Sequence, residues 1–225
     1  MIDRKLFRFS MVLFLILTIY STLFGISTKL LRLTYNEFIT ENIVQWEYSF
    51  SKSDDGYILK MLKNNFSAIV KMDTNLNTQS LRIIQEHNRK FTAQRDGYDL
   101  YFNNVSRGET KNKSIDIYKQ KWHGDFFLLK DFVLSDKKEE KFLMAMLYNQ
   151  SVIKLKAIKE NTDVIEVNGK EYKTIKVRIT LQDWRSMFWS SYFWFRKSDG
   201  ILVKSEEHRG PPGTPLTTME LVGER

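Results

Sequence analysis

The sequence has no cysteine among its 225 residues. This absence excludes disulfide bonds, cysteine-ligated zinc, thiol catalysis and attachment of a lipid to an N-terminal cysteine. All three prolines lie in the segment 210–215, so everything before it can form strands without interruption. The ten glycines make no Gly-rich phosphate loop, and no Gly-x-Ser-x-Gly segment occurs. The sequence therefore has no signature of a nucleotide-binding loop or of a serine nucleophile.

Side chains that could support catalysis are also sparse. The only histidines, His87, His123 and His208, are far apart and form no metal-ligand pattern. We expect them to be surface or loop histidines. Glu206 and Glu207 are adjacent, and adjacent strand residues point to opposite faces, so they cannot act on one substrate. The sequence thus predicts no catalytic residues, no metal ligands and no cofactor.

The composition is that of a folded β-rich protein. Hydrophobic residues make up 42% and charged residues 28%, which argues against global disorder. The high aromatic content of 14% favours strands and apolar cavities over a helical bundle. The net charge of +8 could attract nucleic acid or anionic lipid. The export predicted below makes nucleic acid the poorest of these partners.

An N-terminal hydrophobic segment covers residues 9–28, twenty consecutive residues without a charged side chain. Basic residues precede it, which orients the N-terminus towards the cytoplasm. Two alternatives remain open: a signal peptide cleaved after Ser27, or an uncleaved anchor in the inner membrane. We expect residues 1–27 to be that signal peptide or anchor. Residues 28–225 would form one antiparallel-β domain outside the cytoplasm, in a bacterial periplasm.

Alternating apolar and polar residues, separated by turn residues, predict an all-β domain after this segment. Residues 46–50 alternate, residues 53–56 form a turn, and residues 57–62 continue as the next strand. Residues 66–72 are typical of a further strand. At the C-terminus, residues 216–222 are expected to pair as a closing strand.

Three stretches do not follow this alternation. Residues 30–44 have weak helical character, and residues 107–113 predict a polar loop. Asp136 and Glu139 have the spacing of a capping box at a helix N-terminus. The apolar run at residues 142–147 then fits a short helix over the sheet or a buried strand equally well.

The first of two predicted hairpins has Asn168–Gly169 at its tip. A two-residue loop would set Glu166 opposite Glu171, whereas a three-residue loop would set Glu166 opposite Lys170. The pairing of opposite charges favours the second register.

The second hairpin turns at residues 198–200, which would set Phe195 opposite Val203 and Trp194 opposite Lys204. Alternation places Trp194 and Arg196 outward. The residues expected to face inward and to line an apolar cavity are Ile175, Val177, Ile179, Phe193, Phe195 and Val203.

An aromatic cluster at residues 184–195 contains seven aromatic residues in twelve positions. One interpretation is a core-forming strand with its connection. The other is that these rings line an apolar cavity or touch a membrane interface. Several basic residues alternate with apolar ones nearby and indicate a solvated sheet face or contact with anionic lipid: Lys154, Lys156, Lys173, Lys176 and Arg178.

The C-terminal third resembles periplasmic proteins of the lipoprotein-carrier superfamily, typified by LolA and LolB, and related exported bacterial families. The resemblance rests on the hairpin 164–180, the aromatic strand and Asp-Gly turn of 193–204, Glu207 and the terminal segment 219–222. It implies a strongly curved, incompletely closed antiparallel barrel with short helices over its mouth. In LolA-like carriers the interior holds acyl chains. The chain departs from LolB in lacking a lipidated cysteine.

These observations lead to two functional hypotheses. The first is a non-catalytic extracytoplasmic binding protein whose curved sheet holds a lipid or other apolar ligand, with a protein partner in the envelope also compatible. The second is a structural or assembly module of the cell envelope with a packed core and no ligand. A cavity inside the sheet would favour the first hypothesis.

Overall fold

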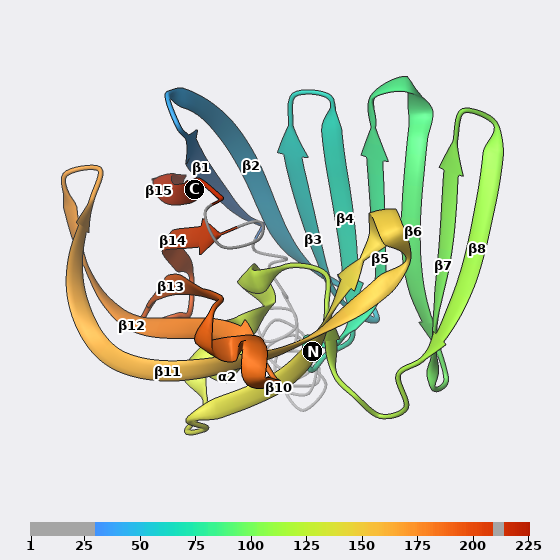
Figure 1. Ribbon diagram of the computed structural model, residues 1–225. Helices are drawn as coiled ribbons and strands as arrows, with labels where there is room; N and C mark the ends of the chain where they lie inside the picture. The colour runs from blue at the N-terminus through green and yellow to red at the C-terminus, as the bar shows by residue number, and fades with distance from the viewer. Residues whose placement is uncertain (1–29, 209–213) are drawn as a thin grey trace, which may run out of the picture.

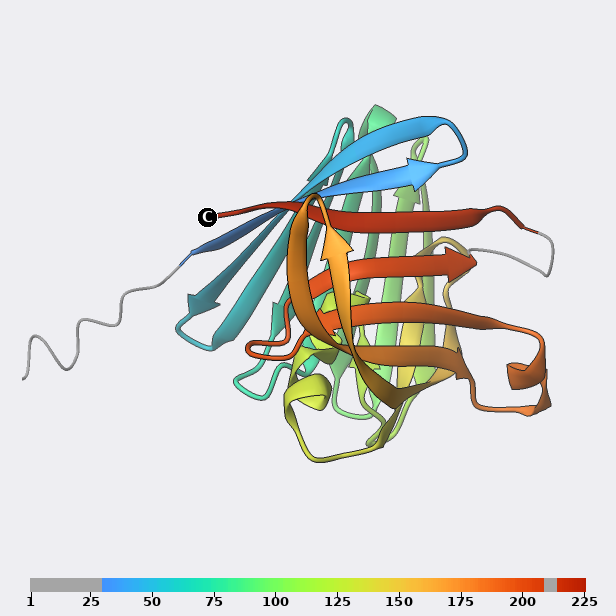
Figure 2. The same cartoon turned by 90° about the vertical axis from the view of Figure 1, so that its left-hand side faces the viewer.

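The computed structural model describes residues 30–208 and 214–225. Within these ranges, fifteen strands form one curved sheet whose outermost strands, β8 and β9, do not pair with each other (Figures 1 and 2). The hydrophobic segment 9–28 and the first two prolines lie outside the described residues. Strand β9 runs parallel to β10, and the other neighbours are antiparallel. The expected fold class, a mainly β, incompletely closed barrel with short helices, is confirmed.

The strand order across the sheet is β8-β7-β6-β5-β4-β3-β2-β1-β15-β14-β13-β12-β11-β10-β9. The strands are β1 (Leu31–Ile39), β2 (Asn42–Ser53), β3 (Gly56–Lys63), β4 (Phe66–Met72), β5 (Thr78–Gln85), β6 (Arg89–Asp96), β7 (Asp99–Ser106), β8 (Glu109–Asp116), β9 (Trp122–His123), β10 (Glu139–Met146), β11 (Ser151–Val167), β12 (Lys170–Leu181), β13 (Ser190–Arg196), β14 (Leu202–His208) and β15 (Leu216–Glu224). Strands that follow one another in the chain pair, except β8 with β9, and β1 also pairs with β15. This pairing joins the two halves of the sheet.

Residues 30–44 form strand β1, a turn at residues 40–41 and the start of β2, so the weak helical character expected for them is wrong. Strand β1 is hydrogen-bonded to β2 on one side and to β15 on the other. Its inward residues Leu33, Tyr35 and Glu37 are buried. Pairing on both sides and burial of every second side chain outweigh the weak local propensity.

Residues 107–113 form the turn and the start of strand β8, so the prediction of a loop is also wrong. Arg107 and Gly108 have φ of 52° and 82°, which suits a two-residue hairpin turn. Strand β8 lies at the edge of the sheet, and nearly all its side chains are exposed. A strand whose two faces are both exposed to solvent needs no alternation of apolar and polar residues, which is why its sequence is typical of a loop.

The apolar run at 142–147 lies mainly in strand β10, so the buried-strand alternative is correct. Glu139 begins that strand, and the predicted capping box is wrong, because pairing with β11 supplies the backbone hydrogen bonds instead. The helical segment lies earlier, as η2 (Phe126–Leu129) and α2 (Lys130–Leu134). Asp125 begins it by accepting a hydrogen bond from the Phe127 amide at 2.8 Å. This segment lies on the concave side of the sheet (Figure 1).

In the β11–β12 hairpin Glu166 lies opposite Glu171, so the favoured three-residue register is wrong. Asn168 and Gly169 have φ of 51° and 71°, the geometry of a two-residue turn. Both carboxylates are exposed, so water and salt screen their repulsion and the turn decides the register.

In the second hairpin Trp194 pairs with Lys204 as predicted, but Phe195 pairs with Leu202 rather than Val203. The register shifts between Trp194 and Phe195, which places one extra residue on β14. This bulge bends the strand, and a bend of this kind cannot be deduced from the turn residues alone.

Candidate functional site

The concave side of the sheet contains a hollow of about 230 Å³. Strands β2 to β5 supply one wall and strands β10 and β13 to β15 supply the other, with the start of η2 between them. The lining is mostly apolar and includes three methionines, whose flexible side chains suit an adaptable surface. The lining residues are Trp46, Tyr48, Met61, Phe66, Ala68, Leu81, Ile83, Gly124, Asp125, Phe126, Met144, Phe193, Leu202, Glu207 and Met219.

Period-2 alternation places these side chains in the hollow. Trp46 and Tyr48 are two residues apart on β2, and Phe66 and Ala68 are two residues apart on β4, so each pair shares the inward face. Small residues leave the space open. A Cβ atom at Gly124 would lie 3.3 Å from a Val70 methyl group, so any larger residue there would press on the wall.

At the C-terminal side of this hollow, aromatic rings pack against one another. The Phe126 ring lies 4.7 Å from the Phe193 ring, and Phe193 lies 6.4 Å from Phe195 (centroid distances). Phe127 and Phe132 are also buried. The η2–α2 segment therefore fills the concave side of the C-terminal strands.

The six residues predicted to line a cavity all lie in this part of the sheet. Five of them are buried and Ile175 is half-buried. Phe193 is the one that lines the hollow. The others are Val177, Ile179, Phe195 and Val203, which are buried outside the hollow's lining. Seven of the fifteen lining residues come from β2 to β5, and the alternation of residues 46–50 was visible in the sequence.

Two carboxylates line the otherwise apolar hollow. Asp125 caps η2, and Glu207 accepts a hydrogen bond from the Ser205 hydroxyl at 2.8 Å. Glu206, its neighbour, is more exposed, which confirms that the two adjacent glutamates face opposite sides of the strand. The hollow thus contains polar acceptors in an apolar wall, which is typical of sites that orient a ligand.

Trp46 and Phe66 separate this hollow from a second, more open one of about 460 Å³, which we call the rim hollow. The rings of Trp46 and Phe66 meet edge to face, with centroids 5.3 Å apart. The remaining lining of the rim hollow is polar: Lys63, Asn64, Asn65, Gln85, Glu86 and Arg89. An apolar interior therefore adjoins a polar rim at two shared rings.

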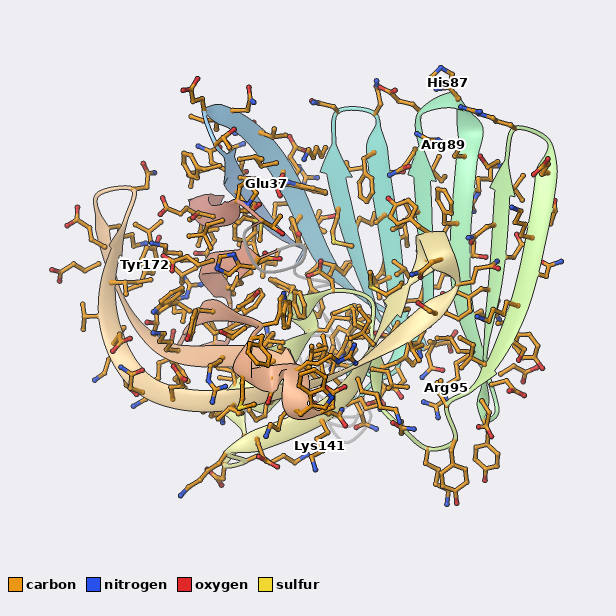
Figure 3. The ribbon with its side chains drawn as sticks, viewed as in Figure 1. Glu37, His87, Arg89, Arg95, Lys141 and Tyr172 are labelled. Atoms are coloured by element: carbon orange, nitrogen blue, oxygen red, sulfur yellow. The ribbon has the colours of Figure 1, made fainter. Side chains whose placement is uncertain are left out.

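The position of Trp46 is set by a buried carboxylate. Glu37 is 0% exposed and accepts hydrogen bonds from Trp46 Nε1 at 2.8 Å and from Lys63 Nζ at 2.7 Å. Lys63 also lies 4.8 Å over the Trp46 ring. Figure 3 shows Glu37 and Arg89 in the upper half of the view, near the hairpin tips of β1–β2 and β5–β6.

His123 departs from the expectation of surface or loop histidines, because it is completely buried on β9. Its Nε2 lies 3.8 Å from Glu140 Oε1, which Lys121 Nζ approaches to 2.9 Å. Burial lowers the pKa of His123. Burial alone would raise the pKa of Glu140, but His123 and Lys121 outweigh it and lower that pKa from 4.5 to about 2. This cluster lies outside the hollow's lining.

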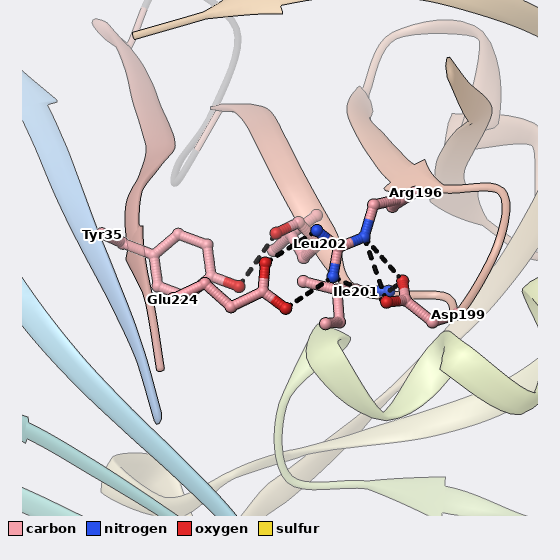
Figure 4. Close-up of polar contacts among 6 residues, drawn as sticks. All are labelled: Tyr35, Arg196, Asp199, Ile201, Leu202 and Glu224. Atoms are coloured by element: carbon pink, nitrogen blue, oxygen red, sulfur yellow. Dashed lines mark hydrogen bonds and ion pairs between the residues drawn. The ribbon is translucent and has the colours of Figure 1, made fainter. Parts of the chain in front are cut away.

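A polar network fixes the wall formed by β13 to β15 (Figure 4). Arg196 donates hydrogen bonds to Asp199 at 2.6 Å and to Glu224 at 2.7 Å, and Tyr35 donates to the Leu202 carbonyl at 2.9 Å. Arg196 lowers the pKa of Glu224. The network thus ties the β13–β14 turn to β15 and to the first strand.

Among the described residues, no helix has the length and apolar character needed to cross a membrane. In the same part of the chain, no three histidine, aspartate or glutamate side chains gather as metal ligands would.

No family model matches the chain, and no curated protein matches it. Among solved structures, it is similar to a β-barrel-like protein of domain of unknown function DUF1849 from Brucella abortus. The TM-score is 0.61 at 10% identity, over 87% of this chain and 96% of that one. At this identity the likeness shows the fold alone, and it agrees with the unclosed sheet described above.

Two further matches have lower TM-scores. The hypothetical lipoprotein YmcC from Escherichia coli has 0.41 at 10% identity, over 91% of this chain and 94% of that one. The LolA superfamily protein NE2245 from Nitrosomonas europaea has 0.29 at 8% identity, over 88% and 86%.

Proposed function

We propose that the chain is a non-catalytic extracytoplasmic binding protein that holds the apolar part of a lipid-like ligand in its hollow. One observation carries this proposal: an apolar hollow inside an unclosed sheet adjoins a polar rim at Trp46 and Phe66. An amphipathic molecule has the same division between an apolar chain and a polar head.

The volume of the hollow limits which ligands it can hold. Its 230 Å³ is below the ~300–1,000 Å³ typical of pockets that enclose drug-sized molecules. It therefore accommodates part of one acyl chain rather than two chains side by side. Since each buried methylene contributes ~0.8 kcal/mol, roughly six of them would contribute about 5 kcal/mol.

The polar head would lie in the rim hollow. Lys63 and Arg89 line it together with the amides of Asn64 and Asn65. Arg89 is half-buried there, and its Nε makes a long 3.5 Å hydrogen bond to the Glu86 carbonyl. These donors suit a carboxylate or phosphate head group.

The location outside the cytoplasm rests on the N-terminal run. Its twenty uncharged residues, preceded by basic ones, support export with cleavage after Ser27 or retention as an inner-membrane anchor. Residues 28–225 would then form the periplasmic domain.

Binding can be tested by filling the hollow. The purified chain, stripped of co-purifying lipid, is titrated with a fluorescent single-chain fatty acid. Ile83→Trp places a larger side chain in the lining, and Ile43→Trp is the matched control, because Ile43 is 63% exposed and outside that lining. We expect the first variant to weaken binding roughly tenfold or more, and the control to bind as the parent chain does. Failure of the parent chain to bind, or equal binding by both variants, would overturn the proposal.

The solid packing of η2–α2 against β13 favours the second candidate, a structural or assembly module of the envelope. Mass spectrometry of the natively extracted chain separates the two. A co-purifying lipid at a fixed ratio supports the binding protein, whereas a lipid-free chain with a protein partner at a fixed ratio supports the module.

A further inference from the structure

The connection between β12 and β13 exposes three large apolar side chains in one turn. It contains η4 (Trp184–Met187) and the following Phe188. Trp184 is 70% exposed, Met187 76% and Phe188 60%. Single exposed apolar residues are ordinary on protein surfaces, but three within five positions form a patch that calls for a partner.

Hydrogen bonds hold this turn in place. The Thr180 hydroxyl donates to the Ser186 or Trp189 carbonyl, at 3.2 Å and 2.8 Å. Asp183 caps η4 by accepting from the Arg185 amide at 3.0 Å. The exposed side chains are therefore presented by an anchored turn, so ordering them on a partner costs little backbone entropy.

A second segment brings another apolar residue to the same end of the sheet. Trp189 Nε1 donates to the His208 carbonyl at 2.8 Å, and His208 pairs with Leu216, which is 45% exposed. Figure 2 shows the β12–β13 connection, the end of β14 and the start of β15 on the right of the view. The start of β1 and the C-terminus lie at the opposite end.

We propose that this turn inserts into the interfacial layer of an anionic lipid bilayer. Tryptophan and phenylalanine are side chains that settle at the boundary between head groups and acyl chains. The net charge of +8 favours anionic lipid, and exposed Lys154 is adjacent, since its carbonyl accepts from the Gln182 amide at 3.1 Å.

The size of the patch favours a bilayer over a protein. The exposed parts of the three side chains amount to roughly 400 Å², because an aromatic side chain offers ~150–250 Å². A stable protein interface takes about 800 Å² from each partner. Shallow insertion into a bilayer needs no such area, and exposed Lys154 offers a further contact to anionic head groups.

This proposal goes beyond the binding of a ligand and does not depend on it. Insertion would nevertheless bring the hollow close to lipid. Phe193, which lines the hollow, follows Phe188 by five residues on the strand that leaves the turn.

The test uses the full chain reconstituted in phosphatidylcholine vesicles, because its N-terminal segment is expected to associate with lipid by itself. Phosphatidylglycerol with brominated acyl chains, which quench tryptophan on contact, is placed either in the same vesicles or in separate acceptor vesicles. We expect quenching in at least one arrangement, reduced in Trp184→Phe and retained in Trp194→Phe, since Trp194 is 8% exposed. Quenching by the acceptor vesicles would show that the turn contacts a second membrane. Quenching within the same vesicles would show that it contacts the membrane in which the chain is reconstituted. Quenching in neither arrangement, or equal quenching in both variants, overturns the proposal.

A second experiment compares two triple variants. If the acceptor vesicles quench, the variants are compared by flotation with those vesicles; if quenching occurs within one membrane, they are compared by the extent of that quenching. One replaces Trp184, Met187 and Phe188 with serine. The control replaces Tyr98, Tyr118 and Val164, which are 53%, 56% and 64% exposed away from this end of the sheet. We expect the first variant to lose roughly tenfold or more of the signal, and the control to keep it. Equal loss in both, or loss of a dimer by the first without any loss of lipid contact, would contradict membrane insertion.

Discussion

Replacing Arg196 with methionine should reveal how strongly the network in Figure 4 stabilises the wall of the hollow. The guanidinium is 16% exposed and donates to two carboxylates, Asp199 and Glu224, from a turn and from a separate strand. Methionine keeps most of the aliphatic packing and removes the charge and the hydrogen bonds. The variant therefore leaves two carboxylates without their hydrogen-bonded cation, and only Lys130 and Lys170 act on them, without a hydrogen bond.

The size of the effect follows from burial. Breaking a fully buried ion pair costs ~3–5 kcal/mol, and an exposed pair contributes ~0–1 kcal/mol. Because Asp199 and Glu224 are 40% and 33% exposed, the Arg196 network lies between these limits. We expect Arg196→Met to lower the free energy of unfolding by about 2–3 kcal/mol, which corresponds to a fall of roughly 4–12 °C in the melting temperature.

Urea denaturation followed by tryptophan fluorescence measures this difference. Arg185→Met is the matched control, because Arg185 pairs with Asp183 at a similar 2.6 Å but both side chains are open to water, 59% and 44% exposed. The control should lose little or no stability, because water and salt screen an exposed ion pair. Adding Asp199→Asn to Arg196→Met should recover part of the loss, because it removes one uncompensated carboxylate. Similar losses in Arg196→Met and Arg185→Met would refute the argument that burial gives the network its strength.

Two further predictions concern pH and the backbone. Burial lowers the pKa of His123 below 6.5. Below pH 6.5 the unfolded chain therefore binds a proton at His123 that the folded chain does not bind, so the free energy of unfolding should fall as the pH drops. Urea midpoints measured between about pH 8 and about pH 5 should fall in the parent chain and change less in His123→Gln; equal slopes would contradict the buried neutral histidine. Gly56 has a φ of 148°, and a Cβ there would lie 2.1 Å from a backbone oxygen, whereas Gly97, with a φ of 58°, faces open space. Gly56→Ala should therefore cost ~3 kcal/mol or more and Gly97→Ala about 1 kcal/mol in thermal unfolding, and equal costs would contradict the close approach of Gly56 to the Met72 carbonyl of β4.

The residues differ in how much of their role could be predicted from the sequence. Strand β4, Phe66–Met72, was predicted with its bounds, because apolar alternation between turn residues is a local signal. The burial of His123 was not predicted. A two-residue strand has no pattern of its own, and His123 is buried because β9 pairs with β10, which is reached only after the η2–α2 segment.

The hollow illustrates the same limit. Alternation correctly assigned Val177, Ile179, Phe193 and Phe195 to the buried side of their strands. It could not show that η2–α2 covers that part of the sheet and leaves space beside β2 to β5 instead. Trp46 and Phe66 lie in segments that were predicted as strands, but nothing local distinguished a wall with space in front of it from a packed one.

The sequence by itself determined the mainly β class, several of the hairpins and the inward face of β12 and β13, because side-chain period and turn chemistry act over a few residues. Only the tertiary structure decided the pairing of β1 with β15, the burial of His123 and the position of the hollow. Each of these depends on contacts between segments far apart in the chain. The hollow is the space that remains where two such packed walls do not meet, and no local pattern of residues specifies it.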